Sequence, residues 1–332
     1  MALIDSFGRT ITYLRVSVTD RCNLKCFYCR VGDDRMVVES QELLTFEELT
    51  RVIRIFSELG IEKIRITGGE PLLRKNVITL IRDLAKLPGM SEVSLSTNAM
   101  LLERFAHDLA HAGLRRVNIS LDSLKPETFA RITRGGQVDG VLRGIKAAVA
   151  AGLHPVKVNM VVMRGVNDDE ILDMVAFAKD HGLILRFIET MPIGEAGLQA
   201  DVNHMPAAEI LARVQSGLGR GEELVAESGG VGNGPANYFG HLPSGTAIGV
   251  ISAKSRNFCA SCNRMRISSR GALVFCLGSS GQTDLKGPLR SGISDAELRA
   301  LIVQSVQLKP SGHTFQNEEQ EGLGHRMSRL GG

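Results

Sequence analysis

The chain has 332 residues and is close to electrical neutrality, with 39 Lys and Arg against 36 Asp and Glu and a formal net charge of +3. This balance gives no overall electrostatic reason to expect a nucleic acid or a membrane surface as a partner. Hydrophobic residues make up 43% of the sequence, but no apolar run reaches the ~18 residues that span a bilayer. Polar residues near the N-terminus interrupt the apolar stretch that a signal peptide needs, so we expect a cytoplasmic protein.

Short runs rich in β-branched residues alternate with segments of helical apolar spacing over roughly residues 12–190. The expected strands are residues 14–18, 63–67, 93–97, 116–121, 156–163 and 183–188. Strand–helix alternation with short connections predicts an α/β fold with parallel strands and right-handed crossovers. The pattern alone leaves open a doubly wound sheet and a full or partial (β/α) barrel.

The helices between these strands carry ordinary start and stop signals. Thr45 precedes Glu48 by three residues, which predicts a capping box, and Asn167-Asp168-Asp169 precedes an apolar stripe. That stripe consists of Ile171, Met174, Val175 and Ala178. Glycines occupy the positions where helices are expected to stop: Gly60, Gly113, Gly152 and Gly182.

The pattern changes after about residue 192. Glycine-rich loops and shorter strand-like pieces at residues 246–252 and 272–277 replace the regular alternation. The sequence therefore predicts a barrel-like or doubly wound domain over residues 1–191 and a smaller C-terminal domain over residues 192–332.

All six cysteines fall into two sets of three. The first set is Cys22, Cys26 and Cys29, and the second set is Cys259, Cys262 and Cys276. A cytosolic chain of this size does not need disulfide staples, so the sets indicate metal sites. Structural zinc and ferredoxin-type clusters take four protein ligands, whereas a [4Fe–4S] cluster on three thiolates leaves one iron open.

Other interpretations of the two sets remain at this point. A distant residue could complete a zinc site at the first set, and the C-x2-C of the second set could be a redox pair or half of a zinc ribbon. His241 and His313 are candidates for a fourth ligand there, although neither has ligand-like spacing. We favour two open clusters.

Polar residues follow the expected strands, at the edge where α/β proteins place their chemistry. Gly68-Gly69-Glu70-Pro71 follows the second strand, and Ser96 and Ser120 close the third and fourth. Two residues without Cβ would let the backbone approach a ligand closely, and a carboxylate can accept from an ammonium group. An ordinary tight turn is the alternative.

Cations interrupt the apolar strands. Arg15, Arg65 and Lys157 lie within expected strands, and Arg264 and Arg266 alternate so that both would face one side of an extended segment. An unpaired buried cation is costly, and guanidinium forks suit phosphate or carboxylate oxygens. We therefore expect these side chains to bind an anionic substrate. Structural ion pairs and outward-facing positions are the alternatives.

The spacing C-x3-C-x2-C, with the aromatic Tyr28 before its last cysteine, resembles the signature of the radical S-adenosylmethionine (SAM) superfamily. The likeness to one branch, the MoaA family of GTP 3′,8-cyclases in molybdenum cofactor biosynthesis, runs essentially from residue 5 to 332. It rests on Phe7-Gly8-Arg9, on the segments 14–23, 64–72, 186–189 and 258–266, and on the terminal Gly331-Gly332. This resemblance implies an incomplete (β/α)6 TIM-like barrel, closed by a C-terminal domain that carries the second cluster.

The resemblance also implies cofactors and roles for particular residues. Two [4Fe–4S] clusters would be bound, one by Cys22, Cys26 and Cys29, and the other by Cys259, Cys262 and Cys276. SAM would bind the first cluster and contact Tyr28, Gly69, Glu70, Ser120 and Met191. GTP would bind the second cluster through guanine and contact Arg15, Arg65, Ser96, Lys157, Arg264, Met265 and Arg266, with Met265 contributing through its backbone.

The implied reaction is that of a lyase. A 5′-deoxyadenosyl radical from SAM takes hydrogen from the ribose C3′ of GTP, and the C3′ radical attacks C8. One-electron reduction of the resulting nucleobase radical through the second cluster, with uptake of a proton, then gives 3′,8-cyclo-7,8-dihydroguanosine triphosphate. The implied partners are an electron donor and the downstream cyclic pyranopterin monophosphate synthase, for a monomer or homodimer. The Gly331-Gly332 tail would enter the active site.

Two positions depart from the family pattern. Ser96 stands where threonine is common, and Ala99 stands where glycine is usual; we expect neither to abolish function. Two other classes were weighed: a radical SAM maturase with an auxiliary cluster, which tends to carry more cysteines, and a non-enzymatic iron–sulfur electron carrier or zinc-bearing binding module.

Overall fold

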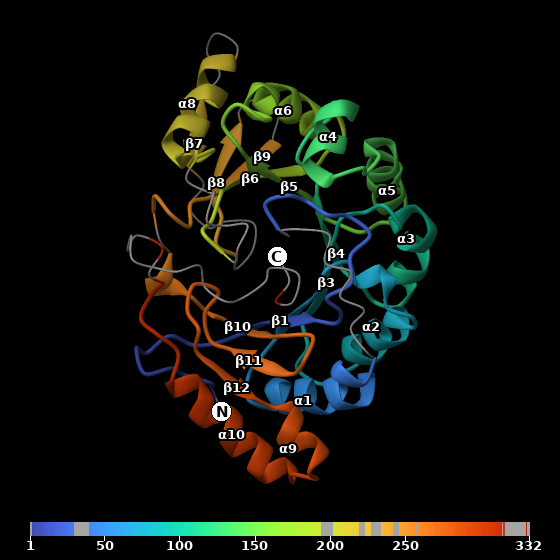
Figure 1. Ribbon diagram of the computed structural model, residues 1–332, viewed down its shortest axis with the longest axis vertical. Coiled ribbons are helices and arrows are strands. Elements are labelled where there is room, and N and C mark those ends of the chain that lie inside the picture. The colour runs from blue at the N-terminus through green and yellow to red at the C-terminus, as the bar shows by residue number, and fades with distance from the viewer. Residues whose placement is uncertain are drawn as a thin grey trace.

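The computed structural model describes residues 2–29, 40–193, 202–218, 223–226, 234–241, 246–256, 258–313, 315 and 330. Strands curve around a central space, and the helices lie on the outside (Figure 1). None of the helices in these ranges is long and apolar enough to cross a membrane.

Six strand–helix units form the first part of the chain, as the alternation of the sequence predicts. The strands are β1 (Tyr13–Ser17), β2 (Lys63–Thr67), β3 (Glu92–Thr97), β4 (Arg116–Ser120), β5 (Val156–Val162) and β6 (Ile184–Glu189). The helices are α1 (Phe46–Glu58), α2 (Val77–Ala85), α3 (Leu102–His111), α4 (Pro126–Thr133), α5 (Val138–Ala150) and α6 (Ile171–Asp180). Short 3₁₀ helices occur at Ser40–Glu42, Pro71–Leu73 and Asp168–Glu170.

The C-terminal part adds strands to the same sheet. Its elements are α8 (Ala207–Gly217), β7 (Leu224–Ala226), β8 (Asn237–His241), β9 (Thr246–Ile251), a 3₁₀ helix at Cys259–Ser261, β10 (Arg264–Ile267), β11 (Ala272–Val274), β12 (Gln282–Asp284), α9 (Lys286–Arg290) and α10 (Asp295–Gln307). The sheet has twelve strands in the order β12-β11-β10-β1-β2-β3-β4-β5-β6-β9-β8-β7. Strands β1 to β6 are parallel neighbours in chain order, which is the arrangement of an incomplete barrel.

The two C-terminal strands next to the barrel join opposite edges of it. Strand β10 pairs in parallel with β1, and β9 pairs in parallel with β6. The register places Arg266 of β10 beside Arg15 of β1, and Arg15 beside Arg65 of β2. Side chains at the same level of neighbouring parallel strands point to the same face. Pairing therefore gathers three guanidinium groups that lie far apart in the sequence.

Most of the expected helix signals are confirmed. Thr45 and Glu48 form the capping box of α1. The four glycines expected at helix ends all have positive φ: Gly60, Gly113, Gly152 and Gly182. Asn167 differs, because its side chain does not cap the helix; it donates to the carbonyls of Asp122 and Val161 instead.

The core lies between the sheet and the outer helices. Leu14, Ile64, Leu95, Ile119 and Val158 are fully buried on successive strands, and the amphipathic helices cover them with aliphatic side chains. The barrel is therefore held from outside, which leaves its interior for polar side chains.

Candidate active site

Two adjoining cavities occupy the barrel interior. The first is lined by the first cysteine set, and the second by the second cysteine set. Four residues line both cavities: Tyr28, Ser120, Asp122 and Asn159. The two sets of cysteines therefore line adjoining cavities.

The two cysteine sets lie near opposite ends of the parallel strands. Cys22 follows the carboxyl end of β1, whereas Cys262 precedes the amino end of β10. Tyr13, the first residue of β1, pairs with Arg264, the first residue of β10. A strand of five residues is about 16 Å long, so one strand length separates the two sets. The sequence argument, which placed the chemistry at carboxyl ends, missed this.

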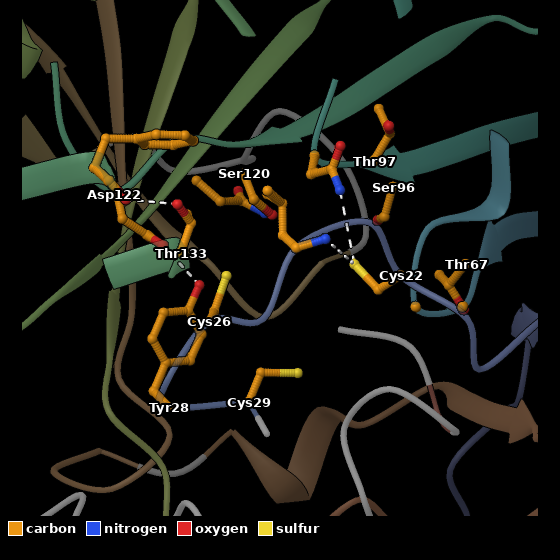
Figure 2. Close-up of a pocket in the computed structure, with 16 residues that line it drawn as sticks. Cys22, Cys26, Tyr28, Cys29, Thr67, Ser96, Thr97, Ser120, Asp122 and Thr133 are labelled. Atoms are coloured by element: carbon orange, nitrogen blue, oxygen red, sulfur yellow. Dashed lines mark hydrogen bonds between the residues drawn. The ribbon is translucent and has the colours of Figure 1, made fainter. Parts of the chain in front are cut away.

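The first cysteine set surrounds one cavity on the loop after β1 (Figure 2). Cys22 Sγ accepts from Leu24 N at 3.4 Å and from Asn98 Nδ2 at 3.7 Å. Burial raises the pKa of the Cys26 thiol, and the neighbouring Asp122 and cysteines raise it further. A positive charge from bound metal would favour the thiolate forms.

Tyr28 and Asp122 form the wall that the two cavities share. The Tyr28 hydroxyl donates to Asp122 Oδ2 at 2.6 Å (Figure 2), and Val161 N donates to Asp122 Oδ1 at 2.9 Å. Burial raises the pKa of Asp122 to about 6, although both hydrogen bonds oppose the shift. The carboxylate thus fixes the aromatic ring between the cavities.

The absence of a Cβ at Gly68 and Gly69 allows close packing within the chain, in addition to any access for a ligand. A Cβ on Gly69 would lie 2.3 Å from the carbonyl oxygen of Arg21, and a Cβ on Gly68 would lie 2.5 Å from that of Thr19. In addition, Gly69 N donates to Thr19 O at 2.7 Å, and Glu70 N donates to Arg21 O at 2.8 Å. The glycine turn therefore holds the loop that leads into Cys22.

Glu70 is buried behind this turn and does not line either cavity. Its carboxylate accepts from Thr97 Oγ1, from Asn98 N at 2.8 Å and from Leu72 N at 3.0 Å. Burial raises its pKa to about 7 against these hydrogen bonds. In this structure Glu70 joins the ends of β2 and β3.

Ala99 follows these residues with φ of 61°, in the left-handed region. Glycine adopts this region without a Cβ penalty, which gives a physical reason for glycine at the position. Ser96 lines the first cavity.

The second cavity combines the second cysteine set with guanidinium groups. Its lining includes Arg15, Arg65, Arg186, Arg264 and Arg266, together with Met191. Met265 is fully buried and does not line the cavity, as the alternation of an extended strand predicts. Sequence reasoning named Arg186 only within a family motif, although a cation inside the expected strand 183–188 was the same signal that identified Arg15 and Arg65.

Arg65, Arg186 and Arg266 are buried, and Arg15 and Arg264 are partly buried. The Nε atoms of Arg15, Arg65, Arg186 and Arg264 have no hydrogen-bond partner within the described residues. Burial lowers the pKa of Arg15 and of Arg266, and the neighbouring guanidiniums lower both further. A guanidinium keeps its proton in proteins, so this wall carries a concentrated positive charge.

Lys157 is buried at the side of these cations and lines neither cavity. Its Nζ donates to the Tyr238 hydroxyl at 2.9 Å. Burial lowers its pKa to about 6, and repulsion from Arg186, Arg116 and Arg65 adds to the shift.

The histidine candidates have different outcomes. His313 lines the second cavity, and neither ring nitrogen has a hydrogen-bond partner among the described residues. The side chain of His241 and the Gly331-Gly332 tail lie outside the described part of the chain.

The donor sets suit clusters better than a single ion. All six cysteines are free of disulfides. Within the described ranges, no three His, Cys, Asp or Glu side chains are close enough to hold one metal ion. The thiolates of a cubic cluster each bind a different iron, so they need a wider spacing. Three thiolates on each cavity therefore fit an iron–sulfur cluster with an open iron.

Replacing Gly69 by alanine should displace the first cysteine loop, because the new Cβ would overlap the Arg21 carbonyl. After anaerobic reconstitution with iron and sulfide, Gly69→Ala should retain about half of the wild-type iron, since only one set is disturbed. Gly234→Ala is the matched control, because a Cβ there meets no atom within 4 Å. Full iron content in Gly69→Ala would show that the turn does not hold the loop.

Comparison with known proteins gives two family matches. Residues 16–178 match the Radical SAM superfamily, and residues 183–315 match Molybdenum Cofactor Synthesis C. Among solved structures, Streptococcus suis SuiB bound to S-adenosylmethionine has a TM-score of 0.62 at 15% identity, covering 96% of this chain and 77% of that chain. At this identity the likeness shows the fold alone.

Curated relatives match the whole chain. The GTP 3′,8-cyclase of Hydrogenovibrio crunogenus is 48% identical over 335 residues, covering 100% of both chains. The GTP 3′,8-cyclase of Moorella thermoacetica is 44% identical over 328 residues, covering 99% of each. Both matches cover the barrel and the C-terminal part of this chain. The chain therefore belongs to the GTP 3′,8-cyclase family of the radical SAM superfamily.

Proposed function

We propose that this protein is a GTP 3′,8-cyclase that uses SAM and two [4Fe–4S] clusters. The observation that carries the proposal is a pair of adjoining cavities, each lined by one three-cysteine set, with guanidinium groups lining the second. One open iron per set gives one binding position for SAM and one for the substrate.

SAM fits the first cavity. Cys22, Cys26 and Cys29 would hold the cluster that binds it, while Tyr28 and Ser120 line the same space. Gly69 lines this cavity, and Met191 lines the adjoining one. The carboxylate of Glu70 is already engaged by Thr97 and Asn98, so we assign Glu70 the positioning of the cavity edge beside the SAM amino group.

GTP fits the second cavity. Arg15, Arg65, Arg264 and Arg266 would bind its phosphates and base, because their guanidinium forks match phosphate oxygens bidentately. Ser96 lines the first cavity and Lys157 lies behind the cations, so we place both at the margin of the nucleotide. Met265 would contribute only through its backbone. Cys259, Cys262 and Cys276 would hold the cluster that binds guanine.

When bound, the clusters and SAM supply electrons and a carbon radical. The chain's own residues orient the substrate and exclude water, so that a radical at C3′ meets C8 of the same nucleotide. We assign the enzyme to the lyases, because the proposed reaction forms a carbon–carbon bond within one substrate without hydrolysis. The product would pass to cyclic pyranopterin monophosphate synthase, and an electron donor would reduce the clusters in the cytoplasm.

The decisive experiment incubates the anaerobically reconstituted, reduced protein with SAM and each of the four nucleoside triphosphates in turn. We expect 5′-deoxyadenosine and a cyclised nucleotide with GTP. Equal 5′-deoxyadenosine release with every nucleotide and no cyclised product would contradict the proposal. Iron and sulfide analysis accompanies it, because about four irons per chain, or stoichiometric zinc, would exclude two clusters.

Removing one guanidinium should weaken GTP binding without disturbing the clusters. Arg266→Ala should raise the dissociation constant for GTP about 10- to 100-fold, the effect of losing charge-assisted hydrogen bonds. Arg82→Ala, at an exposed position of α2, is the matched control. Iron content should equal that of wild type in both variants. Unchanged affinity in Arg266→Ala would remove this residue from the nucleotide site.

GTP binding should be coupled to proton uptake through Lys157. At pH 8 this side chain, with a pKa of about 6, is neutral. A bound triphosphate would offset the repulsion from the neighbouring guanidiniums, although not the burial that is the larger cause, and would so raise the pKa. Up to one proton should therefore be taken up per GTP. Calorimetry in buffers of different ionisation enthalpy measures this number. Lys157→Met should abolish the uptake, and Lys179→Met, an exposed control, should keep it; equal uptake in Lys157→Met would contradict the assignment.

A further inference from the structure

One cation of the second cavity is assigned no role by the site described above. Lys309 follows α10, is only 3% exposed and lines the same cavity as Cys259, Cys262 and Cys276. A buried ammonium group needs hydrogen-bond acceptors and an anion nearby. Its Nζ donates to the carbonyl of Phe275 at 2.7 Å.

That hydrogen bond fixes the ammonium group beside the second cysteine set, because Phe275 directly precedes Cys276. Lys309 and all three cysteines of this set line one cavity, so the ammonium group lies where the three thiolates would gather.

The segment after Lys309 is fastened to the same site from the other side. The Arg9 guanidinium donates to the carbonyls of Cys259 at 2.9 Å, Ser311 at 2.8 Å and Pro310 at 2.6 Å. Arg9 is itself held by Asp5, at 2.6 Å. This N-terminal arginine therefore ties the Cys259 loop to the segment directly after Lys309 through three partly buried hydrogen bonds, which restrict movement of the ammonium group away from the cysteines.

We propose that the Lys309 ammonium is the counter-charge of the second cysteine set and raises the reduction potential of the cluster that these thiolates bind. The inference rests on the proposed function, which places a cluster there. A nearby positive charge and a hydrogen-bond donor stabilise the more negative, reduced state of an iron–sulfur cluster. Burial strengthens the effect, because the interaction is poorly screened by water.

The test measures the second cluster alone, in a full-length background in which Cys22, Cys26 and Cys29 are replaced by alanine. Lys309→Met and Lys309→Arg are compared in this background, with Lys179→Met as the matched control for loss of a remote lysine. Iron and sulfide are counted, and the midpoint potential is measured by a redox titration followed by electron paramagnetic resonance, without SAM or GTP.

We expect a more negative potential in Lys309→Met and a potential close to that of the background in Lys309→Arg and Lys179→Met. Loss of the cluster in Lys309→Met, with retention in Lys309→Arg, would equally support a requirement for the charge. An unchanged potential in Lys309→Met would overturn the proposal. The same unchanged potential with weaker GTP binding in the six-cysteine protein would assign Lys309 to the substrate instead.

Failure of this inference is distinguishable from failure of the proposed function. A background that binds no iron would contradict the second cluster, on which both rest. A more negative potential in Lys309→Met together with no GTP product in the six-cysteine protein would contradict the cyclase assignment and leave the role of Lys309 supported.

Discussion

The pairing of β10 with β1 is the constraint on which the site depends. Strand β1 leads to the first cysteine set at its carboxyl end, and β10 begins just after the second set. Because the two strands are parallel and in register from Tyr13 and Arg264, the two cysteine sets must lie at opposite ends of this pair of strands. The same pairing aligns Arg266 with Arg15, so the space between the sets is lined by cations.

Concentrated positive charge in a protein interior is unfavourable, and the fold tolerates it only because other contacts hold the wall in place. The strands that carry Arg15, Arg65 and Arg186 alternate these cations with fully buried aliphatic residues on their outer face. Burial of that face contributes about 25 cal/mol per Å² of apolar surface. A polyanionic nucleotide would neutralise the wall, which makes binding strongly favourable at a site that is costly when no anion is present.

Two buried carboxylates connect separate segments of the chain around this interior. Glu70 links the ends of β2 and β3, as described above. Glu189, at the end of β6, accepts from Ala207 N at 2.7 Å, from Lys254 N at 3.0 Å and from Ser255, which fastens the C-terminal part to the barrel. Each carboxylate satisfies backbone N–H groups that would otherwise be buried without partners. In this structure both carboxylates therefore hold separate segments of the chain together.

Local pattern predicted most of the fold. Strand and helix positions, the capping box of α1 and the glycine helix ends all follow from apolar periodicity and backbone preference, which act over a few residues. The sequence also showed the two sets of three cysteines through their spacing. It showed Arg15 and Arg65 because a charge within an apolar strand is a local anomaly. The same rule would have found Arg186.

Long-range pairing decided the rest. Sequence alone could not place β10 against β1, since more than 240 residues separate them. It therefore could not show that the cysteine sets lie at opposite ends of the paired strands. The sequence could not show whether Gly69 leaves room for a ligand or for another part of the chain. In the structure it leaves room for the carbonyl of Arg21. The sequence also could not identify Lys309, because its position depends on hydrogen bonds to Phe275 and between Arg9 and the segment after Lys309. The sequence by itself determined which residues could carry the chemistry; only the tertiary structure decided which of them meet, because each meeting depends on contacts between segments far apart in the chain.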